Sequence, residues 1–151
     1  MAVLVDTNIL LRTLQPHHPH CPIAERALSV LRTGNEPMYV TVQNLVEFWA
    51  VATRPTAANG LGLTPEKAAR EMAALKRLFP ILPESVPLLS EWERLVVTHR
   101  VSGKATHDAR LVAAMKVHGV GRILTFDAAG FTGFGLEVID PHALAPRQAL
   151  P

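Results

Sequence analysis

Hydrophobic and polar positions follow two different periods along this chain. Short apolar runs, which are typical of buried strands, lie at 2–5, 38–42, 79–82, 122–126 and 136–139. Between them, apolar residues recur every three or four positions, the pattern of helices that bury one face. This second pattern predicts helices over 8–14, 23–33, 43–53, 65–79, 88–99 and 106–118.

Local start and stop signals agree with these helices. Thr64 followed by Pro65 places a capping hydroxyl before a proline at the first helical position. Thr106 is expected to cap the helix that stops at Gly119. The segment 54–63 contains proline, asparagine and two glycines, so we expect a loop there.

Strands that alternate with helices or helix pairs favour a mostly parallel sheet with helices on both faces. The reason is that parallel strands need long crossover connections, which are usually helical. No internal repeat or change of composition divides the chain. The sequence therefore predicts a single α/β domain over 1–141 and a flexible C-terminal tail over 142–151.

Composition narrows the class of protein but not its function. The 151 residues are 48% hydrophobic and 19% charged, which is typical of a folded domain and not of a disordered chain. The single cysteine, Cys21, excludes an intrachain disulfide and is compatible with a reducing compartment. No signal peptide or membrane span is evident, so we expect a cytoplasmic protein. The net charge of +2 is compatible with binding to a polyanion but does not indicate it.

Four acidic residues from distant parts of the chain are expected at one edge of this sheet. In open parallel sheets, ligands bind beyond the carboxyl ends of the strands. Asp6 ends the first strand, and Asp127 follows the strand at 122–126. Glu47 lies one turn into the helix after the second strand, and Asp108 lies in the first turn of a later helix. Taken singly, each has a structural interpretation: a helix cap, a turn, solvent exposure and the helix dipole, respectively.

Together, these carboxylates would need a cation. Two carboxylates about 4 Å apart repel each other by about 4 kcal/mol at an effective dielectric constant of about 20. A site made only of oxygen ligands suits Mg²⁺ or Mn²⁺ and not zinc. Such an ion takes phosphate oxygens as further ligands and lowers the pKa of a bound water. The set of acids therefore indicates hydrolysis of phosphodiester bonds.

Four segments of the chain resemble the PIN domain, a family of nucleases. They are VLVDTNIL at 3–10, the helix-borne Glu47, HDA at 107–109 and LTFD at 124–127. The segments ATRP at 52–55 and NGLG at 59–62 also resemble one subgroup of the VapC-type toxins of bacterial toxin–antitoxin pairs. The resemblance covers nearly the whole chain, and the four motifs occur in the expected order on the expected elements.

The resemblance implies a three-layer α/β/α sandwich with a Mg²⁺- or Mn²⁺-dependent endoribonuclease activity, in which metal-activated water hydrolyses RNA. It also implies a homodimer and inhibition by a small cognate antitoxin protein. By position, the catalytic and metal-binding acids would be Asp6, Glu47, Asp108 and Asp127. Two further polar groups would orient these acids, namely Asn8 and Thr125.

One position departs from the family pattern. Many relatives carry a further acid before the phenylalanine of the last loop, where this chain has Gly130 and then Phe131. Asp127 therefore has no companion acid in that loop. Basic side chains that could hold RNA phosphates, or could simply face solvent, are Arg12, Arg100, Lys104, His107 and Arg110.

Other interpretations are compatible with some of these residues. A PIN-like module could bind RNA or a protein without catalysis, although the complete set of acids argues against this. A phosphatase could use Asp6 as a nucleophile, but such enzymes need a second aspartate two residues later, where this chain has Asn8. The three histidines within 17–20 could form a metal-binding tract, but the intervening proline favours a solvated loop.

Overall fold

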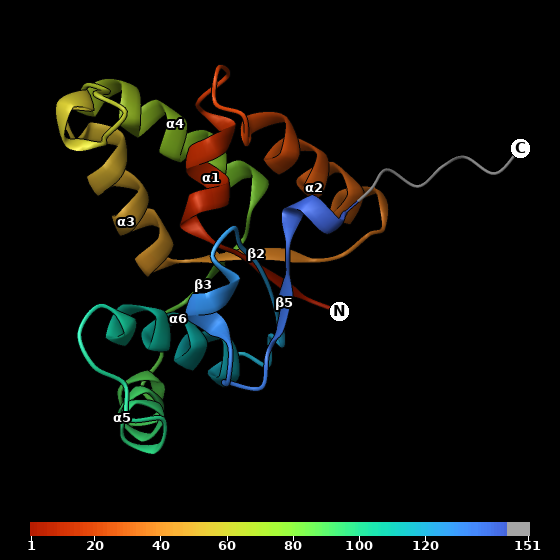
Figure 1. The fold of residues 1–151 in the computed structure, drawn as a ribbon, viewed down its shortest axis with the longest axis vertical. Coiled ribbons are helices and arrows are strands. Elements are labelled where there is room, and N and C mark those ends of the chain that lie inside the picture. The colour runs from red at the N-terminus through yellow and green to blue at the C-terminus, as the bar shows by residue number, and fades with distance from the viewer. Residues whose placement is uncertain (145–151) are drawn as a thin grey trace, which may run out of the picture.

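A parallel sheet forms the centre of the computed structural model, which describes residues 1–144 (Figure 1). Its five strands lie in the order β3-β2-β1-β4-β5, and every neighbouring pair is parallel. The strands are short: β1 Val3–Val5, β2 Met38–Thr41, β3 Ile81–Leu82, β4 Arg122–Leu124 and β5 Glu137–Ile139. The predicted parallel sheet is confirmed.

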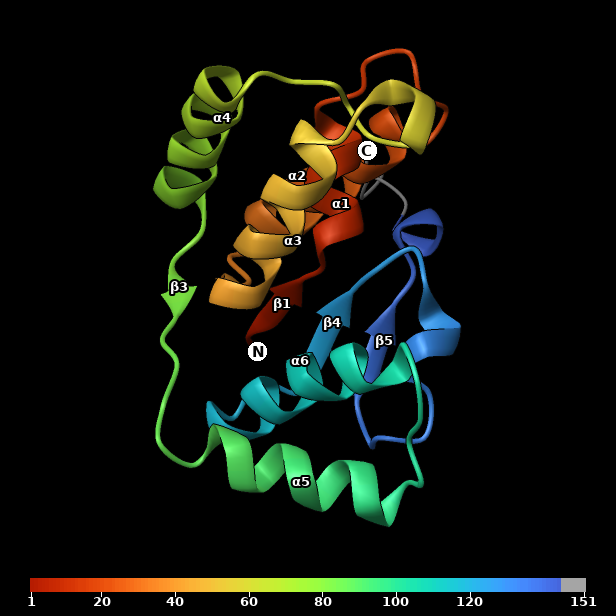
Figure 2. The same cartoon turned by 90° about the vertical axis from the view of Figure 1, so that its left-hand side faces the viewer.

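Among residues 1–144, six α-helices cover the two faces of the sheet. They are α1 Thr7–Thr13, α2 Cys21–Thr33, α3 Val42–Thr53, α4 Pro65–Leu78, α5 Leu88–Thr98 and α6 Ala105–Val117. Figure 2 shows α1 to α4 on one side of the sheet and α5 and α6 on the other, as the two hydrophobic clusters require. Three short 3-10 helices complete the described part of the chain: η1 Thr56–Ala58, η2 Ala128–Phe131 and η3 Pro141–Ala143. The expected three-layer α/β/α arrangement is confirmed.

Side chains alternate along β1 between the two halves of the core. Val3 and Val5 are fully buried on the side of α1 to α4, whereas Leu4 is fully buried on the side of α5 and α6. Full burial of an apolar side chain of this size stabilises the fold by about 1.5–3 kcal/mol. Because β1 is anchored on both faces, the residue that follows it, Asp6, has a fixed place.

The direction in which the chain adds strands reverses beside β1. From β1 the chain adds β2 and then β3 on one side, with α1 to α4 as the connections. It then crosses through α5 and α6 and adds β4 and β5 on the other side. β1 and β4 are direct neighbours, with Val5 opposite Leu124. Their carboxyl ends form the switch point at which open α/β sheets bind ligands.

The start of α6 and the beginning of the C-terminal tail differ from the predicted positions. The expected cap at Thr106 is wrong: α6 begins at Ala105, and the Thr106 hydroxyl donates to the carbonyl oxygen of Gly103 at 2.7 Å. Of the predicted tail, residues 142 and 143 belong to η3, while 145–151 lie outside the described residues. Within residues 1–144, no helix combines the length and the apolar character needed to cross a membrane.

Candidate active site

Asp6 lies at the switch point, directly after β1, and caps α1. Its Oδ1 accepts a hydrogen bond from the backbone N–H of Thr7 at 2.7 Å. Its Oδ2 accepts a second one from the hydroxyl of Thr125, the residue after β4, also at 2.7 Å. Only 8% of Asp6 is exposed, so the carboxylate is held at the junction of the two strands. Asp6 therefore both caps α1 and lies at the carboxyl ends of the strands, where the acids were expected.

The hydroxyl of Thr125 is the centre of a hydrogen-bond network. Besides donating to Asp6, it accepts from the side-chain amide of Asn8 at 3.1 Å and from the backbone N–H of Asp127 at 3.0 Å. The side-chain oxygen of Asn8 accepts from the backbone N–H of Phe126 at 3.2 Å. Asn8 thus joins α1 to the segment after β4 with both halves of its amide. An ionised aspartate at this position would lack the N–H donor, which argues further against a two-aspartate phosphatase site.

Glu47 reaches the same edge of the sheet from α3. Its Oε2 accepts from the hydroxyl of Thr7, and its Oε1 accepts from the side-chain amide of Gln43 one turn earlier, each at 2.9 Å. The Thr7 hydroxyl in turn accepts from the side-chain amide of Asn44 at 3.1 Å. Glu47 is half-buried, and its two oxygens are held from α1 and from α3. It is therefore not a freely solvated side chain.

Asp108 and Asp127 approach the same glycine from two elements. Asp108 lies half-buried in the first turn of α6, and Asp127 is exposed at the N-cap of η2. A Cβ atom placed on Gly130 would lie 2.8 Å from Oδ2 of Asp108 and 3.1 Å from Oδ2 of Asp127. Such distances are shorter than ordinary contacts of a Cβ atom. Because it lacks a Cβ atom, Gly130 leaves room for these two carboxylates.

Burial and repulsion from neighbouring carboxylates disfavour the charged forms of Asp6 and Asp108. Burial raises the pKa of Asp6 to about 6, and the charges of Glu47 and Asp108 add to this, while the hydrogen bonds that Asp6 accepts act in the opposite direction. Burial also raises the pKa of Asp108, and the charges of Asp127 and Glu47 raise it further. A divalent cation among these groups would favour their ionised forms and relieve the repulsion.

The donor set fits a hard, hydrated cation. All four acids offer oxygen, the ligand atom that Mg²⁺ and Mn²⁺ prefer. Within residues 1–144, no three His, Cys, Asp or Glu side chains lie close enough together, as they stand, to hold an ion. Mg²⁺ is usually bound through one or two carboxylates and keeps several waters, so pairs of acids suffice. The arrangement suits an ion that retains water and open positions for phosphate oxygens.

The structure also brings polar residues to the site that the sequence reasoning did not single out. They are less than 10% exposed and comprise Thr7, Thr41, Gln43 and Asn44. Thr41 and Asn44 form a capping box at the start of α3. One signal was present in the sequence, since Gln43 precedes Glu47 by four residues, the spacing of neighbours on a helix face.

Some of the other residues considered from the sequence have partners of their own. Arg110 donates to Gln43 and pairs with Glu84, so its charge is engaged within the chain. The ring of His20 stacks on Phe126 with the ring centroids 4.5 Å apart, so the tract at 17–20 is not simply a solvated loop. Cys21 is a free cysteine and is buried.

Comparison with known proteins places this chain in a family. The PIN domain matches residues 3–132 of the chain. Ribonuclease VapC24 of Mycobacterium tuberculosis is 30% identical over 140 residues, which cover 91% of this chain and 94% of that protein. The match to the PIN domain spans the positions of all four acids.

Two solved structures share the fold at lower identity. VapBC2 from Rickettsia felis, bound to a DNA fragment from its promoter, has a TM-score of 0.70 at 13% identity and covers 92% of this chain and 98% of its own. A toxin–antitoxin complex from Klebsiella pneumoniae has a TM-score of 0.62 at 18% identity, over 92% and 97% of the two chains. The chain belongs to the PIN domain family and, within it, to the VapC-type ribonucleases.

Proposed function

We propose that this chain is the toxin of a toxin–antitoxin pair and an endoribonuclease that depends on Mg²⁺ or Mn²⁺. The observation that carries the proposal is that four separate elements of a PIN-domain fold bring carboxylates to one end of the sheet, where the charges of Glu47 and Asp108 affect Asp6 and the charge of Asp127 affects Asp108. The raised pKa values of Asp6 and Asp108 support a cation at this site. We assign this cation to four ligands, Asp6, Glu47, Asp108 and Asp127.

The chain's own residues hold these acids in place before any substrate arrives. Thr125 and Asn8 fix Asp6 and the backbone that leads to Asp127, and Thr7 fixes Glu47. Acids fixed in this way need little rearrangement during the reaction, which lowers its barrier. When bound, a divalent cation would supply a water of lowered pKa and offset the negative charge that develops on the phosphate.

Asp127 has a more peripheral role in this proposal. It is exposed, and its Oδ1 accepts only a long hydrogen bond of 3.4 Å from the backbone N–H of Gly130. Its charge nevertheless raises the pKa of Asp108, which supports a place at the edge of the same site. We therefore assign the inner positions to Asp6, Glu47 and Asp108.

The proposal includes a small antitoxin protein and a second copy of the chain as partners, with the cytoplasm as the location. Large apolar side chains are exposed on α3 and around the start of α5, for example Val46 at 63%, Val86 at 98% and Leu89 at 63%. Exposed apolar groups of this kind are common where proteins bind one another. We assign the nuclease to a single domain over 1–141.

The direct test is cleavage of a panel of RNAs by the purified chain in Mg²⁺, in Mn²⁺ and in EDTA, with Asp6→Asn alongside. Asparagine is as good a helix cap as aspartate, so this variant should fold. Asp140→Asn is the matched control, because Asp140 also follows a strand at this sheet edge but pairs with His142. We expect cleavage by the wild type and by Asp140→Asn only when metal is present.

Three outcomes would contradict this assignment. Cleavage that persists in EDTA would exclude the metal. Equal cleavage by Asp6→Asn and the wild type would exclude Asp6 as a required ligand of the metal. A wild type that is toxic on expression but cleaves none of the RNAs would favour the catalytically silent PIN-like module.

A further inference from the structure

Gln43 is a buried amide in the first turn of α3, and both halves of the amide are bonded. Its Nε2 donates to Oε1 of Glu47 and to the backbone carbonyl of His107, each at 2.9 Å. Its Oε1 accepts from the guanidinium of Arg110, also at 2.9 Å. Only 9% of Gln43 is exposed. Because arginine only donates and an ionised carboxylate only accepts, these partners fix the orientation of the amide.

The hydrogen bonds of Gln43 join the two helices that carry Glu47 and Asp108. One partner is Glu47 itself, and another is the main chain of the residue directly before Asp108. The two helices, α3 and α6, lie on opposite faces of the sheet. This single side chain therefore links Glu47 to the first turn of α6, which carries Asp108.

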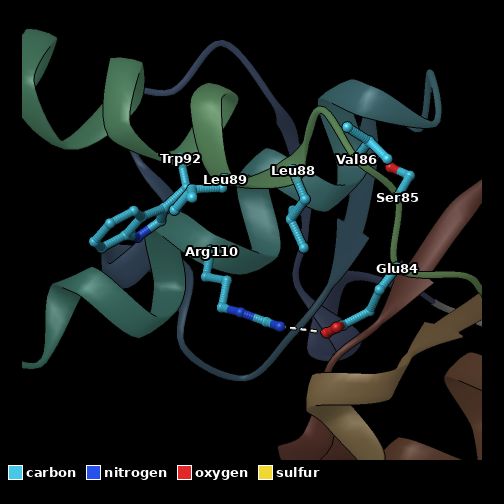
Figure 3. A pocket seen from close by; sticks show the side chains of 7 residues that line it. All are labelled: Glu84, Ser85, Val86, Leu88, Leu89, Trp92 and Arg110. Atoms are coloured by element: carbon cyan, nitrogen blue, oxygen red, sulfur yellow. Dashed lines mark hydrogen bonds and ion pairs between the residues drawn. The ribbon is translucent and has the colours of Figure 1, made fainter.

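Arg110 holds the side-chain oxygen of Gln43 by a hydrogen bond from its guanidinium. The same guanidinium pairs with Glu84, in the segment between β3 and α5, beside a pocket of about 420 Å³ (Figure 3). Figure 3 shows the two side chains pointing toward each other, with Leu88 and Trp92 of α5 in the same pocket. A hydrogen bond from a charged donor is stronger than one between neutral groups, so Arg110 resists rotation of the amide.

We infer that Gln43 is a positioning residue that sets Glu47 against Asp108, and that Arg110 locks its amide in the required orientation. This inference rests on the proposed metal-dependent activity of the same site. Residues that hydrogen-bond to metal ligands typically change metal affinity or activity by about 10- to 100-fold when they are replaced. The hydrogen bond from Gln43 to Glu47 is of this kind.

The test replaces Gln43 by leucine, which keeps the volume and the burial but removes all three hydrogen bonds. Calorimetry without RNA should show an affinity for Mn²⁺ about 10- to 100-fold lower than that of the wild type. The kcat for RNA cleavage should fall as well, while KM should not change. Arg110→Lys keeps a donor but loses the planar fork, so its loss should be smaller than that of Arg110→Ala.

Two controls separate positioning from a general structural effect. Gln15→Ala removes a hydrogen bond of the same kind, with Arg12 at 2.7 Å, and should leave the Mn²⁺ affinity unchanged. In a Glu47→Gln background, Gln43→Leu should cause a much smaller further loss of affinity, because it acts mainly through Glu47. A merely structural role would give the same loss in both backgrounds.

The outcomes distinguish this inference from the proposed function. Wild-type Mn²⁺ affinity and kcat in Gln43→Leu, or an equal loss in the Glu47→Gln background, would overturn the inference and leave the proposed function intact. A wild type that neither binds Mn²⁺ nor cleaves RNA would overturn both. If Gln43→Leu does not fold, Arg110→Ala decides: a lower affinity supports the inference, and an unchanged affinity overturns it.

Discussion

At the scale of single residues, Asp6 combines two opposite effects on stability. Its carboxylate caps α1 by accepting from the backbone of Thr7, which stabilises the helix. The same carboxylate is buried near Glu47 and Asp108, so its negative charge destabilises the metal-free fold. The pKa of Asp6 is raised because burial and the neighbouring charges outweigh the hydrogen bonds that stabilise its charged form.

This balance predicts how the stability of the metal-free protein depends on pH. Between the ordinary pKa of 3.8 and the folded value of about 6, the folded state binds more protons than the unfolded state, so the free energy of unfolding decreases as pH rises. The loss is complete above this range and amounts to at most about 3 kcal/mol. Urea denaturation in EDTA should show Asp6→Asn to be more stable than the wild type at about pH 8 and similar to it at about pH 4. Equal stabilities at the higher pH would contradict the origin given for the shift.

The site also depends on Gly130, which lies close to the carboxylates of Asp108 and Asp127. Gly130→Ala would push its Cβ against the carboxylate of Asp108, so we expect the affinity for Mn²⁺ to fall about tenfold. Gly121→Ala is the matched control, because its Cβ would meet open space and its φ is not positive. Calorimetry with Mn²⁺ on both variants checks this. Equal affinities of Gly130→Ala and Gly121→Ala would mean that the close approach of Gly130 to Asp108 is unimportant for metal binding.

At the scale of elements, the ends of β1 and β4 form the frame of the site. Their apolar runs predicted both strands, and the rule that ligands bind at carboxyl ends predicted the place of Asp6 and Asp127. The bonds from Thr7 to Glu47 and from Asn44 to Thr7 were not predictable in this way. They depend on how α1 packs against α3, and a local hydrophobic period contains no information about this packing.

The junction of β1 and β4 can be tested at Thr125, which is 1% exposed. Thr125→Val keeps the shape but leaves the Asn8 amide and the backbone N–H of Asp127 without their acceptor. An unsatisfied buried polar group costs about 1–3 kcal/mol, so the free energy of unfolding should fall by at least about 1 kcal/mol. RNA cleavage should fall too, because Asp6 loses a donor. Thr13→Val is the control, because the hydroxyl of Thr13 donates only within α1, and this variant should leave cleavage unchanged. Unchanged cleavage by Thr125→Val would refute the role of the network.

At the scale of the whole molecule, the three layers deliver acids to one edge from both faces of the sheet. Glu47 comes from α3 on one face and Asp108 from α6 on the other, while Asp6 and Asp127 follow central strands. The order of helices and strands sufficed to predict this edge. It did not suffice to predict the link through Gln43, because that link depends on how closely α3 and α6 approach across the sheet.

Metal binding should therefore stabilise the whole fold in a pH-dependent way. A ligand that binds only the folded state adds about 2.7 kcal/mol at a concentration 100 times its Kd. At about pH 8 we expect Mg²⁺ to raise the thermal midpoint clearly, and at about pH 5 much less, because protons compete for Asp6 below its pKa of about 6. Asp6→Asn should respond weakly at both pH values. A stabilisation that does not depend on pH would disagree with Asp6 as a ligand.

We propose that the acids at the switch point hold the metal that RNA cleavage requires. The most direct test of this proposal is the rate of cleavage of one RNA as a function of Mg²⁺ concentration, for the wild type and for Asp6→Asn. We predict that the wild-type rate is zero in EDTA and rises to a plateau with Mg²⁺. Asp6→Asn should remain at least about a hundredfold slower at every Mg²⁺ concentration. Replacing a residue that only hydrogen-bonds to a metal ligand costs at most about a hundredfold, so a ligand should cost at least as much. Equal rates for the two proteins, or wild-type cleavage that continues in EDTA, would contradict the proposal.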